Sequence, residues 1–266
     1  MIAEFDLSRR TALVIGAAGG LGREQALGLA RAGADVAIAD LNQSGLQATS
    51  LAIKAVGREV DVFPLDITVP GEVRAVVDAV EKRFGKIDIL VNSAGMTRRG
   101  ASEDYDQGLF ERILDINLNG MFYACQNVGR LMIKRGGGRI INMGSIFSSA
   151  GIAESPAYAM SKGAVAQLTK TLAIEWAPYG IAVNAILPSW FDTAMGNVVA
   201  DREKFYAGTA EVPSSADLAA RTTGRVPLRR LGKPPEIVGA TVFLASNAAS
   251  MVTGHLLAVD GGFLAQ

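Results

Sequence analysis

Short apolar runs alternate with longer segments of helical pattern along the whole chain, and this alternation constrains the fold more than any other feature. The first run, 11–15, is almost entirely apolar, as a strand covered on both faces requires. Strands and helices at this spacing imply right-handed β–α–β units, and hence one α/β domain over residues 1–266 with a doubly wound parallel sheet of about seven strands and helices on both faces. The expected strands are 11–15, 35–39, 60–65, 87–91, 139–142, 181–187 and 256–259, and the expected helices are 21–31, 41–56, 71–84, much of 106–134, and 158–177.

Composition fits such a domain and argues against several other classes of protein. Apolar residues make up 49% of the chain and 26 basic residues balance 26 acidic ones, so we expect neither disorder nor a nucleic-acid-binding surface. The acidic first segment and the absence of a long apolar run predict no signal peptide and no membrane span. The single cysteine, Cys125, fits a reducing compartment, and we therefore expect a cytoplasmic protein.

Two residues with reactive side chains, Cys125 and His255, are expected to have structural roles. Cys125 lies among apolar residues of an expected helix, and we expect a packed thiol. His255 has no cysteine or second histidine to complete a metal site, so we expect a capping or interface role. No metal is expected.

A glycine-rich segment follows the first strand. Glycines at 16, 20 and 22 allow a tight turn and the close approach of backbone to a pyrophosphate, and Gly19 lies in the same segment. The next helix would present free N–H groups and a partial positive charge at its N-terminus. Such a turn also occurs without a ligand, but its place between a first strand and a first helix favours nucleotide binding of the Rossmann type.

Asp40 stands at the end of the second expected strand. A carboxylate there can accept hydrogen bonds from the adenosine ribose and would repel a 2′-phosphate. Neither position 41 nor positions 17–19 hold a basic residue that would neutralise such a phosphate, so NAD is favoured over NADP. Asp40 is also placed to cap the helix expected from Leu41, and the two roles are compatible.

Tyr158 and Lys162 stand four residues apart and share one face of an expected helix. The pKa of a tyrosine is ordinarily about 10, and a neighbouring ammonium lowers it by favouring the phenolate. A Tyr/Lys pair can therefore transfer a proton near neutral pH. The pattern alone also fits a solvated helix face.

Taken together, these motifs resemble those of the short-chain dehydrogenase/reductase family, along essentially the whole chain. The glycine motif matches the family's except that Ile15 replaces its threonine. Asp66, with Ile67 beside it, resembles the aspartate that bonds the adenine amino group. The segment Asn92-Ser93-Ala94-Gly95 resembles the family's Asn-Asn-Ala-Gly, which is tied to sheet integrity and the cofactor ribose.

The resemblance extends to a catalytic tetrad of Asn117, Ser145, Tyr158 and Lys162. It implies that Tyr158 is the acid/base and Ser145 bonds the substrate oxygen. Lys162 would bind the nicotinamide ribose, and Asn117 would hold a proton-relay water by distorting the long helix. Asn119 competes with Asn117, and Ser148 and Ser149 compete with Ser145, but the motif framing favours the first-named residues.

After the sixth strand, one segment resembles the family segment that surrounds the nicotinamide carboxamide. It reads Pro188-Ser189-Trp190-Phe191-Asp192-Thr193, with Ser189 in place of glycine. Trp190 is a candidate for the substrate pocket or for packing beneath a lid. With their neighbours in these motifs, the expected cofactor contacts are Gly16, Gly19, Gly20, Leu21, Gly22, Asp40, Leu41, Asp66, Ile67, Asn92, Ala94, Gly95, Tyr158, Lys162, Pro188, Phe191 and Thr193.

A polar segment of mixed charge, 194–226, is the expected substrate lid. Its basic residues, Arg202, Lys204, Arg221 and Arg225, can meet an anionic substrate or remain solvated. Arg98 and Arg99 are stronger candidates by position. The expected substrate contacts are Ser145, Tyr158, Arg98 and Trp190.

The expected function is NAD-dependent hydride transfer between the cofactor and a secondary alcohol or ketone of a sugar, sugar acid or polyol. The chain resembles gluconate 5-dehydrogenases and, as an alternative, 3-oxoacyl carrier-protein reductases. A non-catalytic nucleotide-sensing scaffold is a minor alternative, against which the intact tetrad argues. The resemblance also implies a homotetramer.

Overall fold

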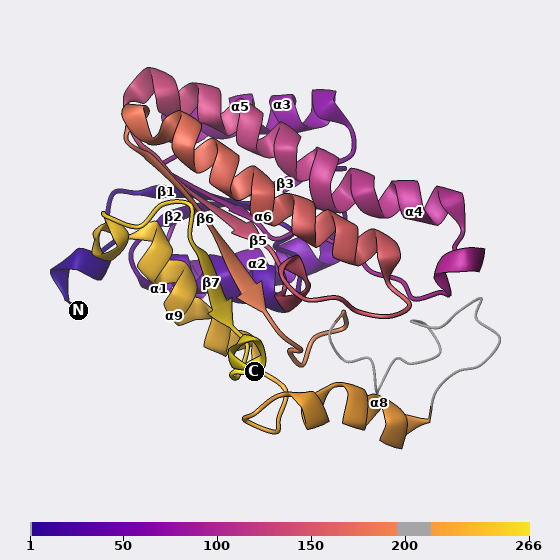
Figure 1. Ribbon diagram of the computed structural model, residues 1–266. Helices are drawn as coiled ribbons and strands as arrows, with labels where there is room; N and C mark the ends of the chain where they lie inside the picture. Colours follow the sequence, from indigo (N-terminus) through magenta and orange to yellow (C-terminus); the bar gives the residue numbers. More distant parts are fainter. Residues whose placement is uncertain (1, 196–213) are drawn as a thin grey trace.

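The computed structural model describes residues 2–195 and 214–266, and its centre is a parallel sheet of seven strands (Figure 1). The strand order is β3-β2-β1-β4-β5-β6-β7, and every pairing is parallel. The predicted doubly wound parallel sheet is therefore confirmed. The strands are β1 (Thr11–Ile15), β2 (Asp35–Asp40), β3 (Val60–Pro64), β4 (Ile89–Asn92), β5 (Gly138–Met143), β6 (Ile181–Pro188) and β7 (Leu256–Val259).

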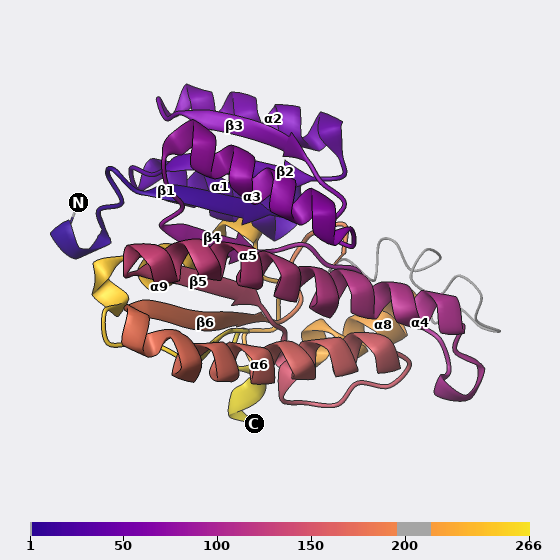
Figure 2. The same cartoon turned by 90° about the horizontal axis from the view of Figure 1, so that it is seen from above.

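Helices cover both faces of this sheet (Figure 2). One face packs against α1 (Gly20–Arg31), α2 (Gln43–Ala55) and α9 (Val238–Ala245), and the other against α3 (Pro70–Phe84), α5 (Gly120–Arg135) and α6 (Pro156–Trp176). Two separate apolar cores result, one on each side. The strands β1, β4 and β6 are buried throughout, which explains their almost continuous apolar sequence.

Local sequence signals account for the helix ends. The side chain of Asn42 caps α2 by accepting a hydrogen bond from Gly45 N, so the helix starts at Gln43 rather than at Leu41 as expected. Proline opens α3 and α6 at their first positions. Gly85 and Gly136 end α3 and α5 in the left-handed conformation.

The long helix expected within 106–134 is interrupted. A first part, α4 (Gln107–Leu114), passes through a π-helical turn, Asp115–Asn119, into α5. The turn inserts extra backbone where Asn117 lies, and such π-turns are frequent at functional sites.

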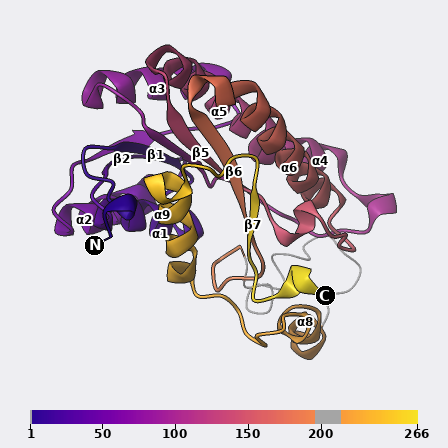
Figure 3. The same ribbon diagram turned by 60° about the vertical axis from the view of Figure 1, so that its left-hand side comes forward.

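The topology creates a crevice at the carboxyl edge of the sheet. From β1 the chain moves outward to β2 and β3, and then returns to the other side of β1 through β4. The helices that follow β1 and β4 consequently leave on opposite faces, which opens the position where α/β proteins bind ligands. A short helix, α8 (Ser215–Arg221), lies near the C-terminus (Figure 3), and its Leu218 shares an apolar cluster with Phe263.

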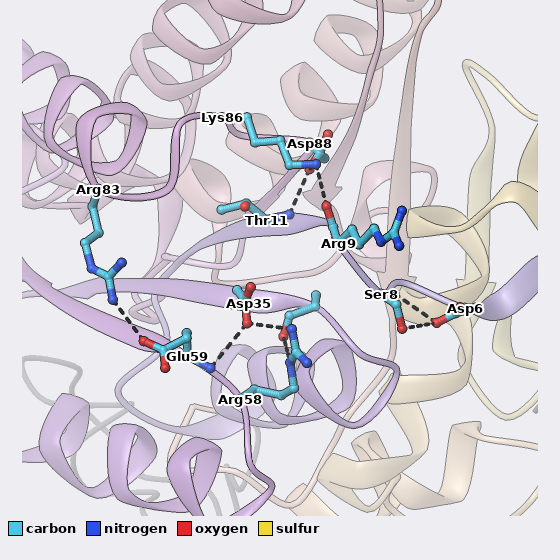
Figure 4. A network of polar contacts seen from close by, with 11 residues as sticks. Asp6, Ser8, Arg9, Thr11, Asp35, Arg58, Glu59, Arg83, Lys86 and Asp88 are labelled. Carbon is cyan, nitrogen blue, oxygen red and sulfur yellow. Dashed lines mark hydrogen bonds and ion pairs between the residues drawn. The ribbon is translucent and has the colours of Figure 1, made fainter.

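The opposite, amino edge of the sheet is stabilised by polar contacts (Figure 4). Asp88 accepts a hydrogen bond from Thr11 N at 2.8 Å and pairs with Lys86 at 2.9 Å. Asp35 pairs with Arg58 at 2.6 Å and accepts from Glu59 N at 3.2 Å. These contacts fix the strand starts, although each partly exposed ion pair contributes only about 0–1 kcal/mol.

No helix among residues 2–195 and 214–266 is long and apolar enough to cross a membrane. Most of the expected lid, including Arg202 and Lys204, lies outside the described residues.

Candidate functional site

The crevice contains a cavity of about 530 Å³ that runs along the carboxyl ends of β1 to β6. Tyr158 and Lys162 lie among its lining residues together with the glycine turn. Of the expected cofactor contacts, the cavity is lined by Gly16, Gly19, Gly20, Leu21, Gly22, Asp40, Leu41, Asp66, Ile67, Ala94, Gly95, Tyr158, Lys162, Pro188 and Thr193.

The glycine turn is shaped by two close approaches. Gly16 has φ +87°, and a Cβ there would lie 2.3 Å from Ala94 N. A Cβ on Gly22 would lie 2.1 Å from the Gly16 carbonyl oxygen. The helix α1 begins at Gly20 without a side-chain cap, so its first N–H groups are available to a ligand at this end of the cavity. The turn therefore forms a cradle for an anionic group.

Asp40 closes the far corner of the cavity. Its carboxylate accepts hydrogen bonds from Ala18 N at 3.1 Å and from Asn42 N at 3.0 Å, and so joins the glycine turn to the start of α2. Each carboxylate oxygen can accept more than one hydrogen bond, so Asp40 can still receive hydroxyl donors from the cavity.

Asp66 lies at the end of the neighbouring strand, β3. Hydrogen bonds from the Thr68 hydroxyl at 2.7 Å and from Thr68 N at 2.9 Å lower the pKa of Asp66, with a smaller contribution from the charge of Arg112. Arg112, from α4, also lines the cavity. Sequence reasoning missed Arg112, because nothing in a helical pattern indicates that this helix reaches over the strand ends.

Asn92 is not brought into the cavity. Its side chain is buried and donates hydrogen bonds to Asn142 Oδ1 at 2.9 Å and to Cys125 Sγ at 3.2 Å. Ser93, which was not predicted, lines the cavity instead. Burial raises the pKa of the Cys125 thiol to about 12, so the thiol stays protonated at neutral pH.

Tyr158 and Lys162 line this cavity, and Ser145 lines a smaller adjoining cavity together with Tyr158. The Ser145 hydroxyl acts on the phenol of Tyr158 by lowering its pKa. The ammonium of Lys162 lies 5.7 Å from the centroid of the Tyr158 ring and donates a hydrogen bond to the Met143 carbonyl oxygen at 2.7 Å. Met143 and Gly144, which line the cavity, were also missed, although their place at the end of β5 is a usable signal.

Burial dominates the titration of both groups. It raises the pKa of Tyr158, which the Ser145 hydroxyl opposes, and it lowers the pKa of Lys162 to about 8. The expectation that the lysine brings the pKa of Tyr158 below its ordinary value is therefore wrong in net direction for this structure. Desolvation of the phenolate outweighs the favourable contacts.

Asn117 is completely buried in the π-turn and fastens it to the loop after β4. Its side chain accepts from Met96 N at 2.8 Å and donates to Met96 O at 3.0 Å. It also donates to the Ser161 hydroxyl at 3.0 Å, on the helix that carries Tyr158 and Lys162. Asn119, the competing asparagine, is exposed and donates a hydrogen bond to Asp115.

A second cavity, of about 110 Å³, adjoins the first at Tyr158. Ser145, Trp190 and Arg99 line it, whereas Arg98 lines neither cavity and donates to the Thr97 carbonyl oxygen. Of the two candidate arginines, Arg99 therefore lines the small cavity and Arg98 does not. Phe191 also lines this second cavity rather than the larger one.

A doubly wound sheet, an anion cradle at its first turn and a Ser/Tyr/Lys cluster beside the same cavity define a nucleotide-dependent oxidoreductase. The comparisons agree. A family model described as "Enoyl-(Acyl carrier protein) reductase" matches residues 16–264. The chain belongs to the short-chain dehydrogenase/reductase family.

Named relatives match the chain from end to end. The 2-dehydro-3-deoxy-D-gluconate 5-dehydrogenase of Bacillus subtilis is 41% identical, with 98% of this chain and 97% of the relative covered. The D-threitol dehydrogenase of Mycolicibacterium smegmatis is 37% identical, covering 98% of this chain and 95% of the relative. The crystal structure of a gluconate 5-dehydrogenase from Burkholderia cenocepacia in complex with NADP and tartrate is 36% identical, with a TM-score of 0.88 and coverage of 99% and 98%.

Proposed function

We propose that this chain interconverts a secondary alcohol and a ketone of a sugar acid or related polyol, with NAD as the cofactor. The observation that carries the proposal is the position of Tyr158, which lines both the nucleotide cavity and the adjoining small cavity. A substrate in the small cavity and a nucleotide in the large one would therefore meet at its phenol.

The residues of the larger cavity fit a dinucleotide. The turn at Gly16 and Gly22 excludes a Cβ at both positions, and the uncapped N-terminus of α1 provides N–H donors for a pyrophosphate. Asp40 and Asp66 offer acceptors to hydroxyl and amino groups at the outer end. When bound, the nicotinamide ring supplies the hydride chemistry.

The protein's own groups handle the proton and the reacting oxygen. Because the pKa of Tyr158 is raised, its phenol retains a proton at neutral pH and can donate it to a ketone oxygen; in oxidation it receives the proton of the alcohol. Ser145 donates a hydrogen bond that steadies charge on the same oxygen. Lys162, protonated below about pH 8, supplies positive charge beside the ring.

Asn117 is the fourth member of the proposed catalytic set, and its role is to shape the binding place of a relay water. Its side chain holds the π-turn against Met96 and Ser161, which leaves the distorted backbone at Asn117 as the place where a relay water would bind. The tetrad of Asn117, Ser145, Tyr158 and Lys162 is thus the proposed catalytic set.

Asp40 supports NAD over NADP. Its carboxylate lines the outer corner of the cavity, and the adjacent positions 18 and 41 hold alanine and leucine. Of the described residues that line this cavity, Arg112 and Lys162 are the basic ones, and the charge of Arg112 acts on Asp66. The structure of the relative from Burkholderia cenocepacia is a complex with NADP, so the test below runs NADP beside NAD.

The substrate class rests on the relatives and on Arg99. Three relatives are named for gluconate derivatives or a tetritol, which are small hydroxylated compounds. Arg99, from the loop after β4, lines the small cavity and donates to the Ala153 carbonyl oxygen at 3.1 Å, which orients its guanidinium. A guanidinium at this point suits the carboxylate of a sugar acid.

The test is NADH formation across a panel of sugar acids, polyols and simple secondary alcohols, with NADP in parallel. A 3-oxoacyl thioester with NADPH and with NADH covers the reductase alternative. We expect turnover with a sugar acid and NAD. Preferential use of the thioester would replace the proposal, and nucleotide binding without turnover of any compound would favour the scaffold alternative.

A matched pair of variants tests the anion site. Arg99→Leu is expected to raise KM for sugar acids by about tenfold or more and to leave KM for uncharged polyols nearly unchanged, because only the acid loses a charge-assisted hydrogen bond. Arg98→Leu, outside both cavities, is the control. Equal effects of the two variants would contradict the assignment.

A further inference from the structure

Ser148 links the turn that carries Ser145 to the helix that carries Tyr158 and Lys162. Its hydroxyl oxygen accepts a hydrogen bond from Ser145 N at 3.2 Å and donates one to the Lys162 carbonyl oxygen at 2.7 Å. A hydroxyl has one donor and two acceptor positions, so it makes both bonds at once. One side chain thus joins β5's end to α6.

The same turn orients the hydroxyl of Ser145. Ser145 Oγ accepts from Phe147 N at 3.2 Å, and Ser145 and Ser148 together form a reciprocal capping box around the 3₁₀ turn Ile146–Ser148. Because an acceptor position of Ser145 faces the Phe147 N–H group, its hydrogen is directed elsewhere and is available to an oxygen beside Tyr158. Ser145 and Tyr158 line the same small cavity, so the direction of the Ser145 hydroxyl decides how it meets an oxygen beside the phenol.

The backbone is shaped to admit the Ser148 hydroxyl. A Cβ on Gly144 would lie 3.0 Å from Ser148 Oγ and 2.4 Å from a methyl carbon of Leu187. Because glycine has no side chain at position 144, the Ser148 hydroxyl can bond both Ser145 N, at the end of β5, and the Lys162 carbonyl oxygen, on α6. Ser145 itself is buried, with 4% of its surface exposed, so movement of the turn changes its contacts directly.

We propose that Ser148 is a positioning residue that holds the Ser145 hydroxyl against Tyr158 by tying the turn to α6. Ser148 is not among the described residues that line either cavity, so it acts through Ser145 and not on the substrate. The inference rests on the proposed function for the experiments that measure turnover, but not for the titration of Tyr158.

The first experiment compares three variants in steady-state kinetics. Ser148→Ala removes both bonds and is expected to lower kcat about tenfold, with KM and nucleotide Kd within about twofold of the wild type. Ser148→Thr keeps the hydroxyl and is expected to restore kcat to within about threefold. Ser149→Ala, at the exposed neighbouring position, is the control and should match the wild type.

A double-mutant cycle separates positioning from general damage to the fold. If Ser148 acts through Ser145, then Ser148→Ala causes no further loss of kcat in a Ser145→Ala background. Additive losses in the double variant would overturn the proposal. So would an unchanged kcat in Ser148→Ala.

A substrate-free readout completes the test. Ionisation of Tyr158 is followed by ultraviolet difference titration against Tyr158→Phe. Since the Ser145 hydroxyl lowers the pKa of Tyr158, a displaced Ser145 in Ser148→Ala is expected to raise that pKa further. An unchanged Tyr158 pKa in Ser148→Ala would overturn the inference. A raised pKa, in a protein that turns over none of the panel compounds, would contradict only the proposed function. If Ser148→Ala does not fold, Ser148→Cys, with a weaker donor of similar size, is expected to show the same directions.

Discussion

The buried ammonium of Lys162 makes the stability of the protein depend on pH. Its pKa in the folded protein is about 8, below the value of about 10.4 in an unfolded chain. Between these pH values the unfolded chain binds more protons, so the free energy of unfolding rises with pH there. Below about pH 8 the lysine is protonated in both states, and the full cost of burying its charge is present.

We predict that Lys162→Met removes this rise in stability between about pH 8 and 10.4 and abolishes most turnover. Urea unfolding at a series of pH values measures the first effect. The wild type should gain stability relative to the variant as the pH increases. Parallel curves across this range would show that Lys162 does not titrate as described.

Asp40 carries the prediction of cofactor preference. Asp40→Ala removes the carboxylate that would repel a 2′-phosphate, and kcat/KM for NADP relative to NAD is expected to rise by about tenfold or more. Asp35→Ala, at the other end of the same strand, is the control because it lies in the polar network of the amino edge. An unchanged ratio in Asp40→Ala would place selectivity elsewhere.

Position in a motif predicted most of the cavity-lining residues but not the direction of every side chain. Asn92 is the last residue of β4, and its side chain turns into the core toward Cys125 and Asn142. Arg98 and Arg99 lie in an irregular segment without periodicity, so the sequence offers no means of choosing between them. The net pKa direction of Tyr158 depends on burial, which a helical spacing cannot supply.

The glycine turn between β1 and α1 permits a sharp stability test. Gly22→Ala would place a Cβ 2.1 Å from the Gly16 carbonyl oxygen, so the turn must shift. We expect a loss of about 1–3 kcal/mol in stability together with weaker nucleotide binding. Gly71→Ala in α3, whose Cβ meets nothing within 4 Å, is the control and should fold normally. Wild-type nucleotide affinity in Gly22→Ala would contradict the cradle.

Helices and strands were predictable because apolar periodicity and terminal glycines or prolines mark them directly. The seven strands lie where the apolar runs are, with ends shifted by a few residues. The π-turn was not predictable from periodicity, because its extra residue shifts backbone hydrogen bonds without changing the apolar pattern. Only the family resemblance anticipated a distortion at Asn117.

The exposed face of α5 and α6 leads to a prediction about assembly. These helices lie side by side on one face of the sheet (Figures 1 and 2). Phe122 on α5 and Met160 and Ile174 on α6 are large apolar residues that expose 39%, 57% and 79% of their surfaces. We predict a homotetramer in which this face is an interface. Ile174→Glu should lower the mass measured by light scattering, and Leu51→Glu on α2, also exposed, is the control. A monomeric wild type would refute the prediction.

Tyr158 is the proposed proton donor and acceptor, so replacing it should stop proton transfer and leave ligand binding in both cavities intact. The most direct measurement is NADH formation by Tyr158→Phe beside the wild type, with nucleotide Kd measured for both. We predict an unchanged Kd, within about twofold, and a kcat lower by about 10²–10⁴-fold, the usual contribution of an acid/base group. A variant that binds NAD and turns over the substrate at nearly the wild-type rate would contradict the account.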